Sequence, residues 1–598
     1  MVKKIIEKLW IYWRIAIGPI KRSFFLLLVL SILVSLFELS GLTMMMSFLD
    51  GVTNPDRFLK SQIAPFIRTL IEISGLTPTR EMLIFFTLCI AGSLYVIKGF
   101  MVSLNQYCSS YIAHGLYIKT KQRIFSFFLK AEYTFISAKG RGGILSDLNQ
   151  PAEDIEFAFV NLGKIILEMI TIVAQLCFIF YFSGWIFFFL GIIAFGIVYF
   201  WKNIVLLKSI RIGREIYEAR TDISKTEIDA MDGIKVVKSY ILSDNFLGKY
   251  KAILAREFKS ALNLVLLKTS PTLFQEIVVM GMVVSLSYIC FFAPSFGLTF
   301  STLVVILISI RRLIPSISGF LVSAVELGRR LKGVEQIESL LYKTPIERTD
   351  GRERLSSIES VKFENVSFRY SGQSKPPILK DLNLQFEKGR MTALVGPSGA
   401  GKSTIANLIA GFFHKESGDI KINGISIENI ALESLRSKIG YISQDIFLFN
   451  ESLKNNITLW RSNISEEQFN TAIKLAHLES VVQDLPGKFD TIVGDRGLKL
   501  SGGQCQRVAI ARAIVNKPDI LIFDEATSAL DNLTEKIIYE AIDSFRSQSV
   551  VIVIAHRLET IKNADQIVVL EGGFVVDHGT HDELINKNNL YAKLYGKK

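Results

Sequence analysis

Six apolar runs, each long enough to cross a lipid bilayer, constrain this chain more than any other feature of its sequence. A membrane-spanning helix needs about 20 predominantly apolar residues. The composition agrees, because 49% of the residues are hydrophobic and the mean hydropathy is +0.35. We predict spans at 23–48, 82–104, 159–182, 185–206, 265–292 and 298–321.

The positions of the basic residues predict which segments face the cytoplasm. Lysines and arginines, which give a formal net charge of +12, crowd the N-terminus and the segments between apolar runs. The polar segments 105–158 and 207–264 are then cytoplasmic, and segment 50–81 is external. The apolar stripe of this external segment suits a helix on the outer membrane surface or one that caps the external mouth of the bundle.

Residues 396–404 form the second strong signal, because their spacing is that of a phosphate-binding P-loop. The apolar run before them predicts a strand, and the residues after them predict a helix. Backbone N–H groups of such a turn cradle phosphates, with Lys402 on the β and γ phosphates of a nucleotide and Ser403 on Mg²⁺. A chance glycine turn is the alternative. The predicted loop consists of Gly396, Pro397, Ser398, Gly399, Ala400, Gly401, Lys402, Ser403 and Thr404.

Two strand ends downstream add candidate catalytic groups. The apolar run 520–523 ends in Asp524 and Glu525, and α/β sheets bind ligands at the carboxyl ends of their strands. We predict that Asp524 holds Mg²⁺ through water and that Glu525 activates the attacking water as general base. A surface acidic pair is the alternative. His556 follows the apolar run 550–554, where it is placed to contact the γ-phosphate, although a lone histidine is more often structural.

A polar stretch with Pro345 and Gly351 separates the two halves of the chain. We place a linker at 341–357, a transmembrane domain at 1–340 and a nucleotide-binding domain at 358–598. Strand and helix patterns alternate through the last of these. The predicted fold class is thus a membrane domain of six transmembrane helices, followed by an α/β P-loop ATPase domain.

The stretch Leu500-Ser501-Gly502-Gly503-Gln504 resembles the signature sequence of ATP-binding cassette (ABC) proteins. Tyr370 in Phe-Arg-Tyr resembles the aromatic residue that stacks on adenine. Gln444 in Ser-Gln-Asp resembles the glutamine that senses Mg²⁺ and the membrane domain. Asp531 ends a Ser-Ala-Leu-Asp loop similar to the one that communicates across a cassette dimer, and His556 in Ala-His-Arg matches the switch histidine. The resemblance implies ATP and Mg²⁺ as cofactors.

The resemblance also implies a dimer, because in this family the signature of one cassette faces the P-loop of another and ATP lies between them. One chain carries one cassette, so we expect a homodimer with two competent ATP sites. Six spans ahead of a cassette resemble the half-transporter arrangement of exporters, whose cytoplasmic loops carry coupling helices. We expect these helices near 133–148 and 222–231. The chain departs from the usual pattern at Asp495 and at Cys505, and neither change removes a catalytic group.

Charged residues inside the predicted spans are candidates for cargo binding, because they are costly in a membrane and therefore functional by default. Arg311 and Arg312 precede Pro315, where a proline kink would aim them at a central cavity. Doubled in a dimer, they would make a basic ring suited to phosphate or pyrophosphate. The alternative is that the pair meets water and anionic lipid heads. The charged residues in the spans are Glu38, Lys98, Glu168, Lys268, Glu276, Arg311 and Arg312, of which Lys268 is the third candidate for the substrate.

The Arg-Leu-Ile-Pro-Ser stretch, Phe-Glu-Leu-Ser-Gly in span one and the long external segment are similar to bacterial flippases of lipid-linked oligosaccharides. The hypothesis is therefore an ATP-hydrolysing exporter or flippase of an amphipathic substrate. Such a pyrophosphate-bearing glycolipid is the first candidate, and a lipid or hydrophobic drug is the alternative. An intact Glu525 weighs against an ATP-gated channel, and the six spans weigh against a cassette ATPase that acts on nucleic acid. We expect a multi-pass protein of the bacterial inner membrane, in contact with lipid, with the N-terminus and ATPase domain in the cytoplasm.

Overall fold

The computed structural model describes residues 21–183, 185–292, 300–347, 351–370, 376–524, 540, 542–554, 561–587 and 590–595. The chain divides into two compact units. The first comprises Met1–Ala131 and Phe135–Pro345, and the second comprises Glu132–Thr134 and Ile346–Lys598. The division therefore falls inside the predicted linker.

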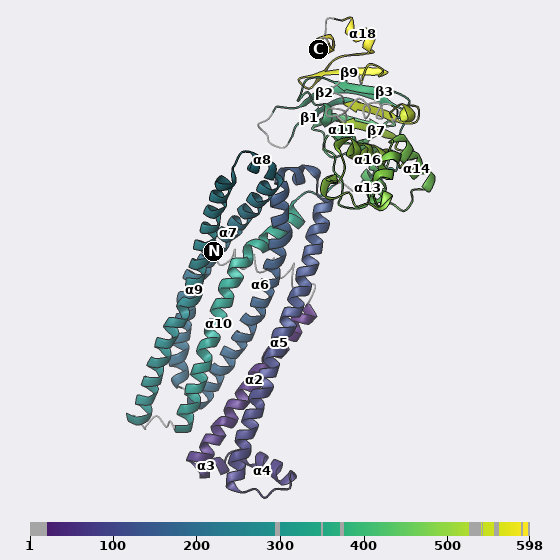
Figure 1. Ribbon diagram of the computed structural model, residues 1–598. Helices are drawn as coiled ribbons and strands as arrows, with labels where there is room; N and C mark the ends of the chain where they lie inside the picture. Colours follow the sequence, from purple (N-terminus) through teal and green to yellow (C-terminus); the bar gives the residue numbers. More distant parts are fainter. Residues whose placement is uncertain are drawn as a thin grey trace. The chain divides into compact units, whose positions relative to one another are not determined.

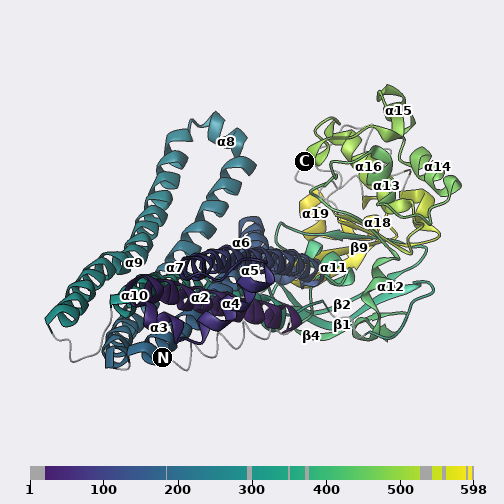
Figure 2. The same ribbon diagram turned by 90° about the horizontal axis from the view of Figure 1, so that it is seen from below.

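The first unit consists of long helices that run alongside one another (Figures 1 and 2). Helix α2 packs along α5, and α7 packs along α9 and α10. A five-residue π-helix at Ser339–Lys343 follows the last long helix. The helices are α2 (Lys21–Thr53), α3 (Pro55–Leu59), α4 (Ile63–Ile73), α5 (Arg80–Lys130), α6 (Tyr133–Ser183), α7 (Trp185–Asp232), α8 (Ile234–Ser239), α9 (Ser243–Phe292) and α10 (Phe300–Glu338).

Four helices within the described part are long and apolar enough to cross a membrane, namely α2, α5, α6 and α10. The predicted spans 185–206 and 265–292 lie on α7 and α9, whose backbones are helical throughout. At 1.5 Å per residue the 51 residues of α5 extend about 77 Å, more than twice the roughly 30 Å hydrocarbon core. The polar segments 105–158 and 207–264 are thus largely continuations of spanning helices.

Short helices lie at both ends of the first unit. In α6, Gly140 has φ 70° and ψ 161°, a left-handed conformation that glycine adopts without strain, so the turns from Tyr133 are set apart from the rest of the helix. Residues 222–231 belong to the last turns of α7, and the short helix beyond them is α8. Helix α4 lies at the opposite end of the unit (Figure 1). It packs Ile67 and Ile71 into a small apolar cluster and exposes Phe66.

The second unit contains two sheets. One is antiparallel, with the order β2-β1-β4-β5. The other has the order β10-β9-β3-β8-β7-β6, and all its pairs are parallel except that of β9 with β10. The strands are β1 (Ser360–Phe368), β2 (Leu379–Glu387), β3 (Met391–Val395), β4 (Ser417–Ile422), β5 (Ile425–Ser426), β6 (Ile439–Ile442), β7 (Ile520–Asp524), β8 (Val550–Ile554), β9 (Gln566–Glu571) and β10 (Phe574–Gly579).

Helices and apolar side chains cover the parallel sheet on both faces. Every residue of β3, β7 and β8 is buried, as expected for central parallel strands. One apolar cluster fills the space towards the signature helix α16, and another lies towards the antiparallel sheet. The helices of this unit are α11 (Lys402–Ile409), α12 (Leu432–Arg436), α13 (Leu453–Thr458), α14 (Glu466–Leu475), α15 (Glu479–Asp484), α16 (Gly502–Ile514), α18 (His581–Ile585) and α19 (Leu590–Tyr595).

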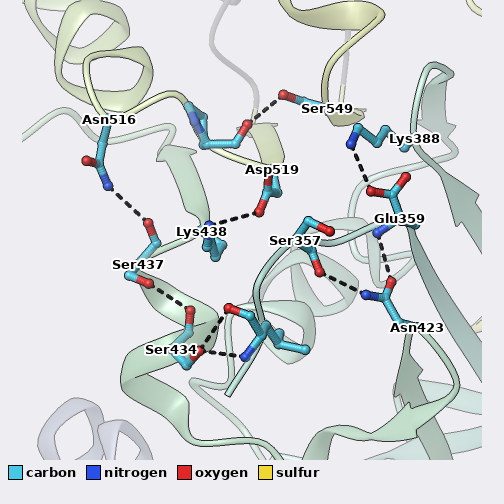
Figure 3. A network of polar contacts seen from close by, with 12 residues as sticks. Ser357, Glu359, Lys388, Asn423, Ser434, Ser437, Lys438, Asn516, Asp519 and Ser549 are labelled. Atoms are coloured by element: carbon cyan, nitrogen blue, oxygen red, sulfur yellow. Dashed lines mark hydrogen bonds and ion pairs between the residues drawn. The ribbon is translucent and has the colours of Figure 1, made fainter. Parts of the chain in front are cut away.

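Polar contacts hold the segment just before β1 against the rest of the second unit (Figure 3). The N–H of Leu355 donates to Ser434 Oγ at 2.8 Å, and Asn423 Oδ1 accepts from the N–H of Glu359 at 2.8 Å. Lys388 forms an ion pair with the Glu359 carboxylate at 2.8 Å. Much of the predicted linker therefore packs as part of the second unit.

Candidate functional site

In the loop between β3 and α11, a side chain at either of two glycines would clash with neighbouring atoms. Gly401 precedes α11 with φ 101°, and a Cβ there would lie 2.5 Å from Leu379 Cδ2. A Cβ on Gly396 would lie 2.1 Å from the carbonyl oxygen of Leu570. The tip of the loop, 397–399, is exposed, and Ala400 is buried beneath it. The first N–H groups of α11 have no partner within the helix, and such groups bind phosphate.

Lys402 lies in the first turn of α11 with its side chain folded back over the loop. It is 5% exposed, and its Nζ donates to the carbonyl oxygens of Gly396 at 2.8 Å and Pro397 at 3.0 Å. Both acceptors belong to the loop itself. An incoming phosphate would offer the same ammonium a stronger, charge-assisted bond.

Ser403 and Asp524, the two predicted metal ligands on separate elements, are in direct contact. Ser403 Oγ in the first turn of α11 donates to Asp524 Oδ1 at the end of β7, at 2.9 Å. Asp524 is 7% exposed. Hydroxyl and carboxylate oxygens are the hard ligands that Mg²⁺ prefers, so the donor set fits this ion. Gln444 is exposed two residues beyond β6, the strand next to β7.

Tyr370 follows β1 and contacts the end of the P-loop. Its hydroxyl lies 3.2 Å from Thr404 Oγ1, and its ring packs edge-on against Phe368 and Phe413 at centroid distances of 5.0 and 5.1 Å. Phe413 in turn packs against Tyr133, which groups with the second unit, at 5.7 Å. The predicted adenine-side aromatic is therefore held in place by an aromatic cluster.

The signature residues form the start of α16. Ser501 caps the helix, accepting from the N–H of Gln504, whose side chain accepts in return from the N–H of Ser501. This reciprocal capping box fixes the first turn of the helix. Ser501 and Gly502 are exposed, and Gly503 is half-buried.

Arg512, further along α16, ties this helix to the chain that follows Gln444. Its guanidinium donates to the carbonyl oxygens of Phe447 at 2.7 Å and Asn456 at 2.8 Å. Burial lowers the pKa of Arg512 to about 10, and the side chain still remains protonated at neutral pH.

Three predicted residues, Glu525, Asp531 and His556, lie outside the described residues. The strands that lead to Glu525 and His556 are adjacent and in register, with Asp524 opposite Ile554. The carboxyl ends of β7 and β8 therefore meet at the same edge of the sheet.

In the first unit, a buried carboxylate gathers side chains from three other helices. Glu38 of α2 is 2% exposed. It accepts from Arg312 Nε of α10 at 2.8 Å, pairs with Lys98 Nζ of α5 at 3.2 Å and accepts from Gln175 Nε2 of α6 at 3.3 Å. Two cations thus share one carboxylate. We call Glu38, Lys98, Gln175 and Arg312 the intramembrane cluster.

The other predicted cargo residues have different surroundings. Arg311 is exposed and forms no ion pair with the described residues. Lys268 of α9 pairs with Glu326 of α10, which also binds Arg329 at 3.0 Å. Glu168 of α6 lies against Gly319 of α10, where a Cβ would be 2.9 Å from Glu168 Oε1.

Comparison with known proteins identifies both units. Residues 24–314 match the family model of the ABC transporter transmembrane region, and residues 379–528 match that of the ABC transporter ATPase. An ATP-dependent lipid A-core flippase of Shewanella denitrificans is 31% identical over 531 residues, which cover 87% of each chain. The chain belongs to the ABC transporter family. It therefore binds ATP and couples ATP hydrolysis to transport across a membrane.

Other relatives and a solved structure match this ABC transporter over most or nearly all of its length. A lipid A-core flippase of Legionella pneumophila strain Paris is 31% identical over 511 residues, covering 83% of this chain and 85% of that one. One of Shewanella sp. strain MR-4 is 29% identical over 600 residues, covering 98% of both. The structure of a bacterial Atm1-family ABC exporter with ATP bound matches with a TM-score of 0.82 and 25% identity, covering 96% of this chain and 98% of that one. The fold is thus that of an ABC exporter.

Two sets of side-chain contacts in this ABC transporter were not predicted from its sequence. Glu38 and Lys98 were candidates only as isolated charges, and their shared contact with Arg312 was not foreseen. One signal was present, since opposite charges in separate apolar runs favour pairing. The contact of Tyr441 with Asp524, described below, had no sequence signal.

Proposed function

We propose that this transporter is a homodimeric flippase that moves an amphipathic glycolipid with a phosphate or pyrophosphate head, and that a lipid-linked oligosaccharide is its first candidate cargo. The intramembrane cluster is the observation that carries the proposal. The cluster holds two cations, Lys98 and Arg312, on one carboxylate, Glu38, which leaves one positive charge in excess in each chain.

The depth of the arginines favours a role within the bilayer. Arg312 is about 18 Å along α10 from its first residue at 1.5 Å per residue, near the middle of the predicted span 298–321. The buried partner Glu38 also lies near the middle of a predicted span, 23–48. A contact with lipid head groups below the bilayer would require both helices to be displaced by half a span.

An acidic head group has a clear chemical match in Arg312 of the cluster and in Arg311, the residue before it in the sequence. Guanidinium groups bind phosphate oxygens with two parallel hydrogen bonds, and Arg311 has no carboxylate partner among the described residues. The names of the relatives point to the same class, because each is a lipid A-core flippase. The competing candidate is a lipid or drug without phosphate, which would use Glu38 and Arg312 only as a neutral structural pair.

The proposed ATP cycle assigns roles to the residues of the second unit. Ser403 and Asp524 would hold Mg²⁺, with Gln444 beside it, and the ion would neutralise charge on the transferred phosphoryl group. Lys402 would exchange its loop carbonyls for phosphate oxygens. Glu525 would position the attacking water, and His556 would contact the γ-phosphate.

Two copies of the chain are needed in this proposal to complete each ATP site. The exposed Ser501 of one copy would face the P-loop of the other, and Asp531 would lie at the contact between the two cassettes. Tyr370 would stack on adenine. ATP binding would bring the cassettes together and turn the cavity outward, and hydrolysis would reset it in the inner membrane.

The test is ATPase activity of the protein in lipid vesicles with and without lipid-linked oligosaccharide. We expect the glycolipid to stimulate the wild type. In Arg311→Ala/Arg312→Ala the half-maximal glycolipid concentration should rise about tenfold or more, since bonds to charged groups contribute about 1.5–3 kcal/mol each. Glu525→Gln should abolish hydrolysis.

Arg211→Ala/Arg214→Ala is the matched control, because it removes two exposed arginines from the cytoplasmic part of α7. It should respond like the wild type. If phosphate-free lipids or drugs stimulate, and the Arg311/Arg312 variant responds equally, the glycolipid proposal is wrong and the lipid or drug exporter replaces it.

A further inference from the structure

Tyr441 occupies a position that no motif assigns, between the P-loop helix and the end of β7. It lies on β6 and is paired in register with Ile522 of β7. Its hydroxyl is 3.2 Å from Asp524 Oδ2 and 3.2 Å from Asn407 Oδ1, one helical turn after Ser403 on α11. The tyrosine thus contacts both elements that carry the proposed metal ligands.

The two oxygens of Asp524 have different partners. Oδ1 accepts from Ser403 Oγ at 2.9 Å, and Oδ2 is within reach of the Tyr441 hydroxyl. A hydroxyl that ligates a metal through a lone pair can still donate its hydrogen, so a metal ion bound by Ser403 would leave the bond to Asp524 Oδ1 possible. The bonds from Ser403 and from Tyr441 would then together fix the plane of the carboxylate.

The Tyr441 hydroxyl has two acceptors within reach. A tyrosine phenol is protonated at neutral pH and has one hydrogen to donate. Asp524 Oδ2 and Asn407 Oδ1 each lie 3.2 Å from it. The proton is therefore directed towards the carboxylate or the amide.

The ring of Tyr441 is held from its other side. Phe412, which follows α11, packs against it with centroids 6.1 Å apart and an angle of 73° between the planes. Phe412 is itself fixed by the Arg436 guanidinium, 5.2 Å from its centroid, and by the ring of Tyr133 at 5.3 Å. This packing restricts the phenol to one direction, as positioning of a partner requires.

We propose that Tyr441 is a positioning residue that orients the Asp524 carboxylate for Mg²⁺. The inference rests on the metal role proposed for Asp524 and is independent of the cargo. Orienting groups of this kind, one shell away from the metal, commonly change metal affinity by about 10- to 100-fold when they are removed.

The experiment compares Tyr441→Phe with the wild type in the full-length protein in detergent. Phenylalanine keeps the ring and its contact with Phe412, and removes only the hydroxyl. Binding of Mn²⁺, as a probe for Mg²⁺, is followed by electron paramagnetic resonance in the presence of a non-hydrolysable ATP analogue. Binding of the same analogue is measured separately in EDTA. We expect Mn²⁺ affinity to fall about tenfold, with metal-free nucleotide affinity within twofold of wild type.

Tyr591→Phe is the matched control. Its hydroxyl is also buried, and it lies 2.7 Å from His581 Nδ1 in the C-terminal helices. This variant should leave both affinities unchanged. A loss of metal-free nucleotide binding in Tyr441→Phe equal to the loss of Mn²⁺ binding would reveal a structural role and overturn the proposal.

Asp524→Asn separates failure of this inference from failure of the metal role itself. If Asp524→Asn loses Mn²⁺ and Tyr441→Phe binds like the wild type, Tyr441 does not position the carboxylate, and the metal role stands. If neither variant changes Mn²⁺ affinity, Asp524 is not a metal ligand and both proposals fall.

Discussion

In the second unit, one consecutive stretch at 396–404 carries most of the groups that would meet a nucleotide, whereas in the first unit a single carboxylate collects side chains from three other helices. A loop at a helix start presents its own backbone N–H groups, so its chemistry is local. A charge inside a membrane must find its partner on another helix. In the proposed function, hydrolysis depends on short motifs and cargo binding on distant pairs, so substitutions in the two units should have separable effects.

The variant Lys402→Ala is the strongest test of this difference between the two units. Loss of a positioned cation at developing phosphate charge costs at least about 100-fold in rate, so vesicle ATPase activity should fall to background. Helix α10 should be unaffected, and the thermal stability of the membrane unit should not change. Lys474→Ala, which removes an exposed lysine of α14, is the control. Residual activity within tenfold of wild type would show that this ammonium is dispensable.

A second test addresses the distant pairs. Glu38→Gln leaves Lys98 and Arg312 without their carboxylate, and removing one partner of a buried ion pair typically costs about 3–5 kcal/mol. We expect a clearly lower unfolding temperature in detergent and an unchanged ATP affinity. Equal losses of stability and of ATP affinity would contradict the separation of the two units.

The double variant Glu38→Gln/Arg312→Gln sharpens that result. It removes the uncompensated guanidinium as well, so part of the stability should return. Glu72→Gln, at an exposed i,i+4 pair with Arg68 on α4, should change stability by less than about 1 kcal/mol. A double variant less stable than Glu38→Gln would mean that Arg312 stabilises the unit through another partner.

The smallest expected effect concerns Cys505, within the first turn of α16. Burial raises the pKa of this thiol above its ordinary value. Because only the thiolate reacts, a variant with Cys505 as its single cysteine should be alkylated more slowly than free cysteine at pH 7.5. The rate should keep rising at a pH where free cysteine has levelled off. Alkylation as fast as that of free cysteine would show that the start of α16 is open.

The two-part architecture, and a loop between a strand and a helix at 396–404, were predictable from the sequence because these depend on local order. An apolar run of membrane length or a glycine-rich turn after a strand leaves few alternatives. The contact of Ser403 with Asp524 was also foreseeable, since parallel strands bring their carboxyl ends to one edge. The segment 222–231, predicted as a coupling helix, belongs to the last turns of α7, and the separate short helix α8 follows it.

The partners of charged side chains were not predictable from local order. Arg312 was expected to face a cavity as one of a pair, and the structure gives it Glu38, 274 residues away. The direction of a side chain around a helix depends on which neighbours the helix packs against, and this information is not contained in a single apolar run. The positioning role proposed for Tyr441 was not predictable for the same reason, because it depends on the neighbouring strand β7.

The entry of the chain into the second unit has a practical consequence for exchanging ATPase modules between transporters. Glu347 binds Arg436 through two hydrogen bonds of 2.8 and 3.0 Å, and a Cβ on Gly351 would lie 2.1 Å from the carbonyl oxygen of Ile430. A chimera joined within 351–357 would place this segment against the surface of a foreign ATPase unit, which need not provide the matching contacts. The natural junction for a module swap lies before Ile346, so that the donor carries its own docking segment.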